Sequence, residues 1–183
     1  MITELINDMN KALDNDCYLA ALAIALMLPD ICAKAKYPEE KSNRKRYIDW
    51  YDEYIGQYQK CPDDDKSPYL SGEVVYSLRC NFLHQGTPNI EKDGIKEDSC
   101  KIDKFILVRQ KKDKLGMYYD TSSITIDLSK CVPTKKPSRT YEVNIRGLCQ
   151  KIEWCVKSYY NKNKDKFDFF NYSIVDYEEI NKF

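Results

Sequence analysis

The chain has 183 residues, of which 43% are hydrophobic, and its 29 basic and 29 acidic side chains give a formal net charge of zero. This length and composition are typical of one soluble globular domain that can bury its own core. The balanced charge argues against a dedicated binder of duplex DNA, which is normally strongly basic.

The N-terminus and the cysteines bear on the cellular compartment. Residues 1–8 lack the basic stretch and apolar core of a signal peptide. The longest apolar run, residues 17–28, is too short to span a bilayer and suits a buried helix. The eight cysteines form no CxxC pair and there is one histidine, so we expect no disulfide framework, no zinc site and no other cofactor. We therefore expect a cytoplasmic protein without a membrane partner.

Three helices are expected before residue 60. Residues 2–13 carry apolar side chains at helical spacing, which predicts a short amphipathic helix. Residues 17–35, with a cap available at 14–16, are apolar almost all round, and such a helix is central to a bundle. We expect Pro29 to kink or interrupt it. A third helix is expected from a cap at Ser42 or Asn43 to about residue 58.

Basic side chains cluster at the start of the third predicted helix. Arg44, Lys45 and Arg46 lie where the positive end of the helix dipole gives them no stabilisation. We interpret them as candidate RNA contacts, and a solvated charged turn is the alternative. The segment 61–68 that follows is a linker rich in turn residues.

The helix predicted between residues 71 and 86 has both of its ends marked in the sequence. Ser71 can cap the first turn and Glu73 puts a carboxylate near the positive end of the dipole. Gly86 tolerates a left-handed stop, and Pro88 prevents continuation. The spacing of its apolar residues indicates that one face belongs to the core.

Arg79 and His84 lie in the C-terminal half of this helix. Five positions separate them, or about 140° around the axis at about 100° per residue, so both can reach one ligand at the helix end. His84 is the only histidine in the chain and the one unperturbed side chain suited to acid–base chemistry near neutral pH. Arg79 has a planar charged fork suited to phosphate. The pair indicates phosphodiester cleavage, although a histidine at a helix C-terminus also interacts favourably with the dipole without any function.

The pattern changes after residue 86. Short β-branched runs at 105–108 and 124–128 predict a β-hairpin inserted between helices. A last long helix is expected from residue 141 to about 161, capped by Ser138 or Thr140. We expect a mainly α single domain in which residues 1–88 and 140–162 form the bundle, 102–130 the hairpin and 163–183 a tail that docks on the bundle or on a partner chain.

The segment from Tyr76 to Gly86, YSLRCNFLHQG, resembles the arginine–four-residue–histidine signature of HEPN domains, helical bundles that include ribonucleases and nucleotide-binding proteins. The apolar helix that ends in Leu-Pro-Asp30-Ile and the segment 46–54 look like the preceding helices of HEPN-like proteins from bacteria and their phages. The position after the arginine, which many HEPN enzymes fill with a polar residue, is Cys80, followed by Asn81. The resemblance covers about the first ninety residues and a later helix.

The resemblance implies a metal-independent endoribonuclease in which His84 acts as general acid or base, Arg79 stabilises the phosphorane and Asn81 orients the phosphate or the histidine. It also implies a homodimer that places two motifs across its interface, and a role in phage defence or a toxin–antitoxin pair with an antitoxin or other protein partner. Two alternatives remain: a non-catalytic module that binds RNA or nucleotide or mediates assembly, and a structural Arg–His pair. The structural alternative predicts Arg79 buried against Asp30, Asp49 or Asp52, with Tyr76 as a further supporting residue.

Overall fold

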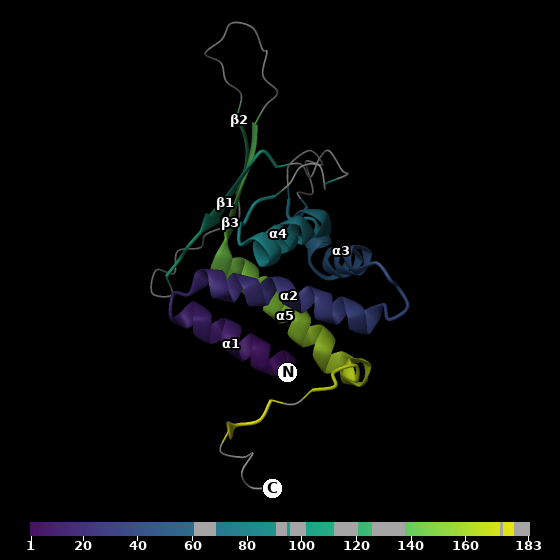
Figure 1. Cartoon of the computed structure of the whole chain (residues 1–183). Coiled ribbons are helices and arrows are strands. Elements are labelled where there is room, and N and C mark those ends of the chain that lie inside the picture. The colour runs from purple at the N-terminus through teal and green to yellow at the C-terminus, as the bar shows by residue number, and fades with distance from the viewer. Residues whose placement is uncertain are drawn as a thin grey trace, which may run out of the picture.

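The computed structural model describes residues 1–60, 69–90, 95, 102–111, 121–125, 138–172 and 174–177. Within them the protein is mainly α, with five α-helices and a small sheet that stands on one side of the helices (Figure 1). The helices are α1 Ile2–Asp14, α2 Tyr18–Lys36, α3 Asn43–Tyr54, α4 Gly72–Gln85 and α5 Ile145–Lys162, with short 3-10 turns η1 Gly56–Tyr58 and η4 Lys164–Phe167. The strands are β1 Lys104–Val108, β2 Thr121–Thr125 and β3 Ser138–Asn144.

The apolar helix α2 lies at the centre of the bundle, as its sequence predicts. It packs against α1, α3, α4 and α5, and side chains such as Leu22, Leu26 and Leu28 are fully buried. Pro29 does not interrupt α2, which runs from Tyr18 to Lys36. The expected interruption is therefore wrong, because tertiary packing on an almost wholly apolar helix outweighs the loss of one backbone donor, whereas the kink at Pro29 stays a prediction. In the described parts of the chain α2 is also long and apolar enough to cross a membrane, a test that a buried core helix passes as well.

Several predicted helix ends are confirmed and others are wrong. Ser42 caps α3 by accepting from the Lys45 N–H at 3.2 Å, whereas α3 ends at Tyr54 and a separate 3-10 turn follows. Cys17, not a residue of 14–16, occupies the N-cap of α2 and makes no side-chain cap bond. Helix α5 begins at Ile145 rather than 141, and Asn144 caps it by accepting from the Gly147 N–H at 3.2 Å.

The sequence predicted a β-hairpin in which the runs at 105–108 and 124–128 pair with each other, and this pairing is wrong. The sheet order is β1-β3-β2: β1 lies parallel to β3, and β2 lies antiparallel to β3 on its other side. The central strand is the segment that we expected to be loop and first helical turn. Tyr141 and Val143 alternate in burial with Glu142 there, which is the two-residue period of a strand. Because β3 runs directly into α5, the sheet is joined to the bundle through one continuous segment.

The tail docks onto the bundle at its start. Phe167 is buried and makes edge contacts with Tyr159 and Tyr160, at ring-centroid distances of 6.1 and 5.0 Å. Phe169 lies under the Lys34 ammonium of α2, 4.5 Å from its ring centroid. The aromatic residues after α5 therefore cover part of the α2–α5 surface.

Candidate functional site

Both ends of helix α4 are capped, and its N-terminus also receives a hydrogen-bond acceptor from α3. Ser71 accepts from the Val74 N–H at 3.3 Å, and Gly86 ends the helix with φ of 71°. Asp52 of α3 accepts from the Gly72 N–H at 2.6 Å. Asp52, expected as a possible partner of Arg79, thus caps α4 across the helix interface and fixes where that helix starts.

Arg79 is paired with Asp30 of α2. The Arg79 Nη2 to Asp30 Oδ2 distance is 2.9 Å, and the two side chains are 18% and 27% exposed. The guanidinium also lies 5.8 Å from the ring centroid of Tyr76 and 3.9 Å from the Cys80 Sγ. Of the three carboxylates considered from the sequence, Asp30 is the one the structure brings to Arg79, and Tyr76 lies in the same group.

Burial and charge act in opposite directions on this group. Burial lowers the pKa of Arg79. The charge of Asp30 and the contact with Cys80 raise this pKa by more than burial lowers it, so the pKa lies above the ordinary value. Burial, together with a hydrogen bond to Cys80, raises the pKa of Tyr76. Burial also raises the pKa of Tyr47, whose hydroxyl donates to the Leu26 carbonyl at 3.1 Å. Arg79 is therefore a fixed cation among neutral phenols.

His84 and Asn81 occupy different environments on α4. His84 is exposed in the last turn, where a cation also interacts favourably with the helix dipole. Asn81 is buried, and its Nδ2 donates to the Asn89 carbonyl at 3.0 Å. This bond ties the segment after Gly86 back to α4, so Asn81 shapes the surroundings of the helix end where His84 lies.

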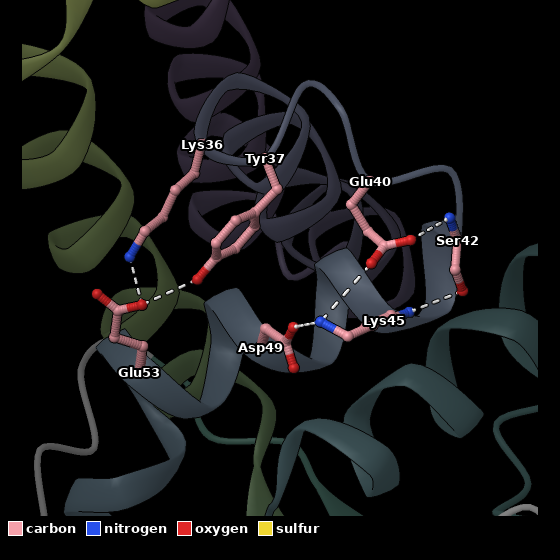
Figure 2. A network of polar contacts seen from close by, with 7 residues as sticks. All are labelled: Lys36, Tyr37, Glu40, Ser42, Lys45, Asp49 and Glu53. Carbon is pink, nitrogen blue, oxygen red and sulfur yellow. Dashed lines mark hydrogen bonds and ion pairs between the residues drawn. The ribbon is translucent and has the colours of Figure 1, made fainter.

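The three basic residues expected to contact RNA have partners within the chain. Arg44 pairs with Glu73 of α4 at 3.1 Å. Lys45 pairs with Asp49 at 2.6 Å and lies 3.7 Å from Glu40 (Figure 2). The Arg44–Glu73 pair ties the start of α3 to α4, and the Lys45–Glu40 contact ties it to the loop before α3, whereas the Lys45–Asp49 pair lies within α3.

A hollow of about 490 Å³ lies beside Asp30 and brings Arg46 to the edge of the candidate site. It is lined by Asp30 and Lys34 of α2, by Arg46 of α3 and by aromatic residues of the tail such as Phe169. Arg46 is oriented there by donating from Nη1 to the Glu40 carbonyl at 2.6 Å. Two cations and the carboxylate that holds Arg79 therefore face one concave surface, which is suited to an anionic ligand.

Sequence reasoning missed Lys34 as a member of this surface. Lys34 follows Asp30 by four residues, which places both side chains on the same face of α2. That spacing was the available signal, but it could not show that the tail folds back over α2 and makes the surface concave. Tyr47 was also assigned only to the core, although it lies near enough to Arg79 and Asp30 for their charges to act on its hydroxyl.

Within the described residues no group of three or more His, Cys, Asp or Glu side chains lies close enough to hold a metal ion. The cysteines of that part of the chain are free thiols, and burial raises the pKa of Cys149 to about 12. Comparison with family models, with curated proteins and with solved structures finds no match to this chain.

Proposed function

We propose that the chain is a HEPN-like endoribonuclease that cleaves RNA without a metal ion, through Arg79 and His84 of α4. The observation that carries the proposal is a fixed, permanently charged guanidinium on the same helix as the exposed and only histidine of the chain. The resemblance of residues 76–86 to the HEPN signature supports the same assignment. The hollow lined by Lys34 and Arg46 beside Asp30 supports an anionic substrate.

The proposed reaction is an internal transfer within the RNA. The ribose 2′-oxygen attacks the adjacent phosphorus as it loses its proton, the bond to the 5′-oxygen of the next nucleotide breaks, and that oxygen takes up a proton. The products are a 2′,3′-cyclic phosphate and a 5′-hydroxyl end. His84 transfers one of these protons as general acid or base, and Arg79 stabilises the extra negative charge of the phosphorane. Asn81 orients the end of α4 through its bond to Asn89.

Asp30 acts in this proposal as a positioning residue. Its bond to Nη2 fixes the plane of the guanidinium, and a guanidinium has further N–H donors for a phosphate oxygen. Restricting the guanidinium before substrate binds reduces the entropy lost in reaching the transition state. The carboxylate also offsets part of the arginine charge, so the gain is in orientation rather than in field strength.

We further propose a homodimer that brings two such motifs together, because one histidine per chain leaves one of the two proton transfers without a second general acid–base group. Sedimentation equilibrium is expected to give twice the 21.5 kDa of one chain. An antitoxin or another protein partner in a defence system fits the same resemblance.

The second candidate function is a non-catalytic RNA-binding or assembly module. The partly buried Arg79–Asp30 pair favours it, because an ion pair between α2 and α4 also fixes helix packing without any chemistry.

The experiment that separates the two uses purified protein, single-stranded RNA and EDTA, with the same RNA carrying 2′-O-methyl groups as the control substrate. We expect cleavage of the unmodified RNA alone, cyclic phosphate ends, and a loss of at least about 100-fold in rate in Arg79→Ala and His84→Ala. A folded wild type that cleaves no RNA, or that cleaves the 2′-O-methyl control, would contradict the nuclease proposal.

A further inference from the structure

The hollow beside Asp30 lies between α2, the start of α3 and the tail that follows α5. Its volume is about 490 Å³, within the range of pockets that hold small ligands. One wall is the face of α2 that carries Asp30 and Lys34, and a second wall is formed by Asn43 and Arg46 of α3. We call this site the α2–tail hollow. Its third wall is the tail, whose described lining residues are Phe169, Phe170, Asn171 and Tyr172.

Arg46 brings to the hollow a hydrogen-bond donor that the chain does not satisfy. Its Nη1 donates to the Glu40 carbonyl at 2.6 Å and its Nη2 donates to the Asn43 Oδ1, so the guanidinium is fixed in one orientation. The Arg46 Nε–H is buried and has no acceptor within the described part of the chain. A buried donor without an acceptor is costly, and most such groups have a protein, water or ligand partner. A ligand oxygen that enters beside Arg46 would supply the missing acceptor.

Two further features of the α2–tail hollow favour an anion. Asn43 is the first residue of α3, so the positive end of the dipole of that helix lies at the hollow. The Lys34 ammonium lies 4.5 Å from the ring centroid of Phe169, which keeps it on the tail side of α2. Asp30 is also a lining residue, but its carboxylate is paired with Arg79 at 2.9 Å, and this pairing offsets its charge. The arrangement is suited to a phosphate group between Arg46 and Lys34.

The tail wall is a series of aromatic rings anchored in the core. Phe167 is buried, and the Phe170 ring lies 6.4 Å from it between centroids. Phe169 lies 4.5 Å from Phe170 on one side, and Tyr172 makes an edge contact with Phe170 at 6.1 Å on the other. Tyr172 is 54% exposed, so its ring remains accessible to a flat group from solvent.

We propose that the α2–tail hollow binds one nucleotide of the RNA substrate, with its phosphate on Arg46 and Lys34 and its base stacked on Tyr172. A nucleotide combines the two groups that the hollow accommodates: phosphate oxygens for the donors and a flat ring for the aromatic wall. The inference deepens the proposed function and rests on it for the choice of an RNA chain over a free nucleotide, which has the same chemistry. Because Asp30 lines the hollow and pairs with Arg79, this nucleotide lies next to the bond that is cleaved.

An adjoining hollow limits how much of the RNA backbone the site contacts. It shares Lys34 and Arg46 with the α2–tail hollow and also has a volume of about 490 Å³. Besides lysines, its described lining includes the exposed carboxylates of Asp165 and Asp168. These carboxylates repel a second phosphate, so we expect one phosphate contact and a salt dependence that corresponds to release of about one counterion.

The test is a titration of ¹⁵N-labelled protein, followed by amide chemical shifts at low salt in EDTA. The probes are AMP, adenosine, which lacks the phosphate, and a 2′-O-methyl hexaadenylate, which cannot be cleaved because it lacks the attacking hydroxyl. We expect AMP and the hexaadenylate to shift the amides of residues 30–34, 43–46 and 169–172. Adenosine is expected to bind at least about 5-fold more weakly than AMP, because it lacks the charge-assisted bonds.

Two variants with exposed side chains separate the phosphate contact from the base contact. Lys34→Gln keeps the stem of the side chain and is expected to weaken AMP binding at least about 3-fold, with adenosine unaffected. Its matched control is Lys11→Gln, at an exposed lysine of α1. Tyr172→Ala is expected to weaken AMP binding at least about 5-fold and Tyr172→Phe to retain most of it. Tyr177→Ala, at a 79% exposed tyrosine of the same tail, should bind as wild type does.

Three outcomes would overturn the proposal: no shifts at the hollow with any probe, equal affinity for AMP and adenosine, or wild-type affinity in both Lys34→Gln and Tyr172→Ala. Binding of AMP without binding of the hexaadenylate would overturn the assignment to RNA and identify a site for a free nucleotide. Binding of both probes by a protein that does not cleave unmodified RNA would leave the α2–tail hollow standing and refute the catalytic role of Arg79 and His84 alone.

Discussion

At the scale of single residues, Arg79 depends on one carboxylate. Asp30 was one of three carboxylates that the sequence offered as its partner, and the structure selects it at 2.9 Å. The sequence could not make that choice, because it depends on how α2 and α4 cross. It also could not show that Asp52 is occupied at the Gly72 N–H and therefore serves another purpose.

Removing Asp30 is expected to destabilise the fold as well as reduce activity. Asp30→Ala leaves a half-buried guanidinium unpaired, so we expect a loss of about 1–3 kcal/mol in the free energy of unfolding, measured by urea denaturation. Asp30→Asn keeps an acceptor and should lose less. Asp8→Ala is the matched control: it breaks the exposed Lys11–Asp8 pair, in which the side chains are 76% and 61% exposed, and should have no effect beyond experimental error. Equal stability of Asp30→Ala and wild type would show that the pair does not hold α2 to α4.

At the scale of elements, the start of α4 is set by a close approach to α3. A Cβ built on Gly72 would lie 2.7 Å from the Ile48 carbonyl oxygen and 2.9 Å from the Ile48 Cα, both backbone atoms that cannot move aside cheaply. Gly72 and Arg79 belong to the same helix, so the position at which α4 begins also determines where Arg79 lies. Glycine at position 72 is therefore needed for the geometry of the candidate site as well as for the helix contact.

Gly72→Ala is therefore expected to lower the free energy of unfolding by about 1–3 kcal/mol, as overpacking usually does. Gly147→Ala in the first turn of α5 is the matched control. Its Cβ would meet nothing nearer than the Asn144 Cβ at 3.7 Å, so we expect no loss and a gain of up to about 1 kcal/mol from helix propensity. Thermal or urea unfolding of the two variants checks the difference, and equal effects would contradict the tight α3–α4 contact.

The helix caps of α4 could be predicted from the sequence, whereas the strand β3 could not. The caps at Ser71 and Gly86 could be predicted because both act locally within a few residues. The strand β3 could not, because Val143, Leu148 and Ile152 also fit a helical spacing and conceal the alternation of Tyr141 and Val143. Its strand conformation depends on the pairing with β1, whose residues lie more than thirty positions earlier.

At the scale of the whole molecule, the connection from α2 to α3 contains a network of polar contacts that depends on pH (Figure 2). Glu53 pairs with Lys36 and accepts from the Tyr37 hydroxyl at 3.0 Å. The hydrogen bond from Lys36 lowers the pKa of Glu53 despite the opposing effect of burial. Burial lowers the pKa of Lys36, but its bonds to Glu53 and Tyr54 outweigh this and leave the pKa raised.

These two shifts fix the direction of the pH dependence. A carboxyl group with a lowered folded-state pKa stabilises the fold above its unfolded pKa of about 4.3, and this contribution is lost as the pH falls through the folded value. A lysine with a raised pKa contributes below its unfolded value of about 10.4 and loses this only at still higher pH. We expect the melting temperature to be flat near neutrality and to fall below about pH 5, and Glu53→Gln to make the acid fall shallower. Glu39→Gln, in the exposed turn before α3, should leave the profile as in wild type; an unchanged profile in Glu53→Gln would contradict the assignment.

The central claim is that His84 performs chemistry, and it is tested most directly by one comparison of rate with stability. His84 and Gln85 are adjacent and exposed at the end of α4, so His84→Ala and Gln85→Ala should both melt within experimental error of wild type. We expect His84→Ala to lose at least about 100-fold in the rate of RNA cleavage in EDTA, and Gln85→Ala to cleave as wild type does. Cleavage by His84→Ala at the wild-type rate would contradict the claim.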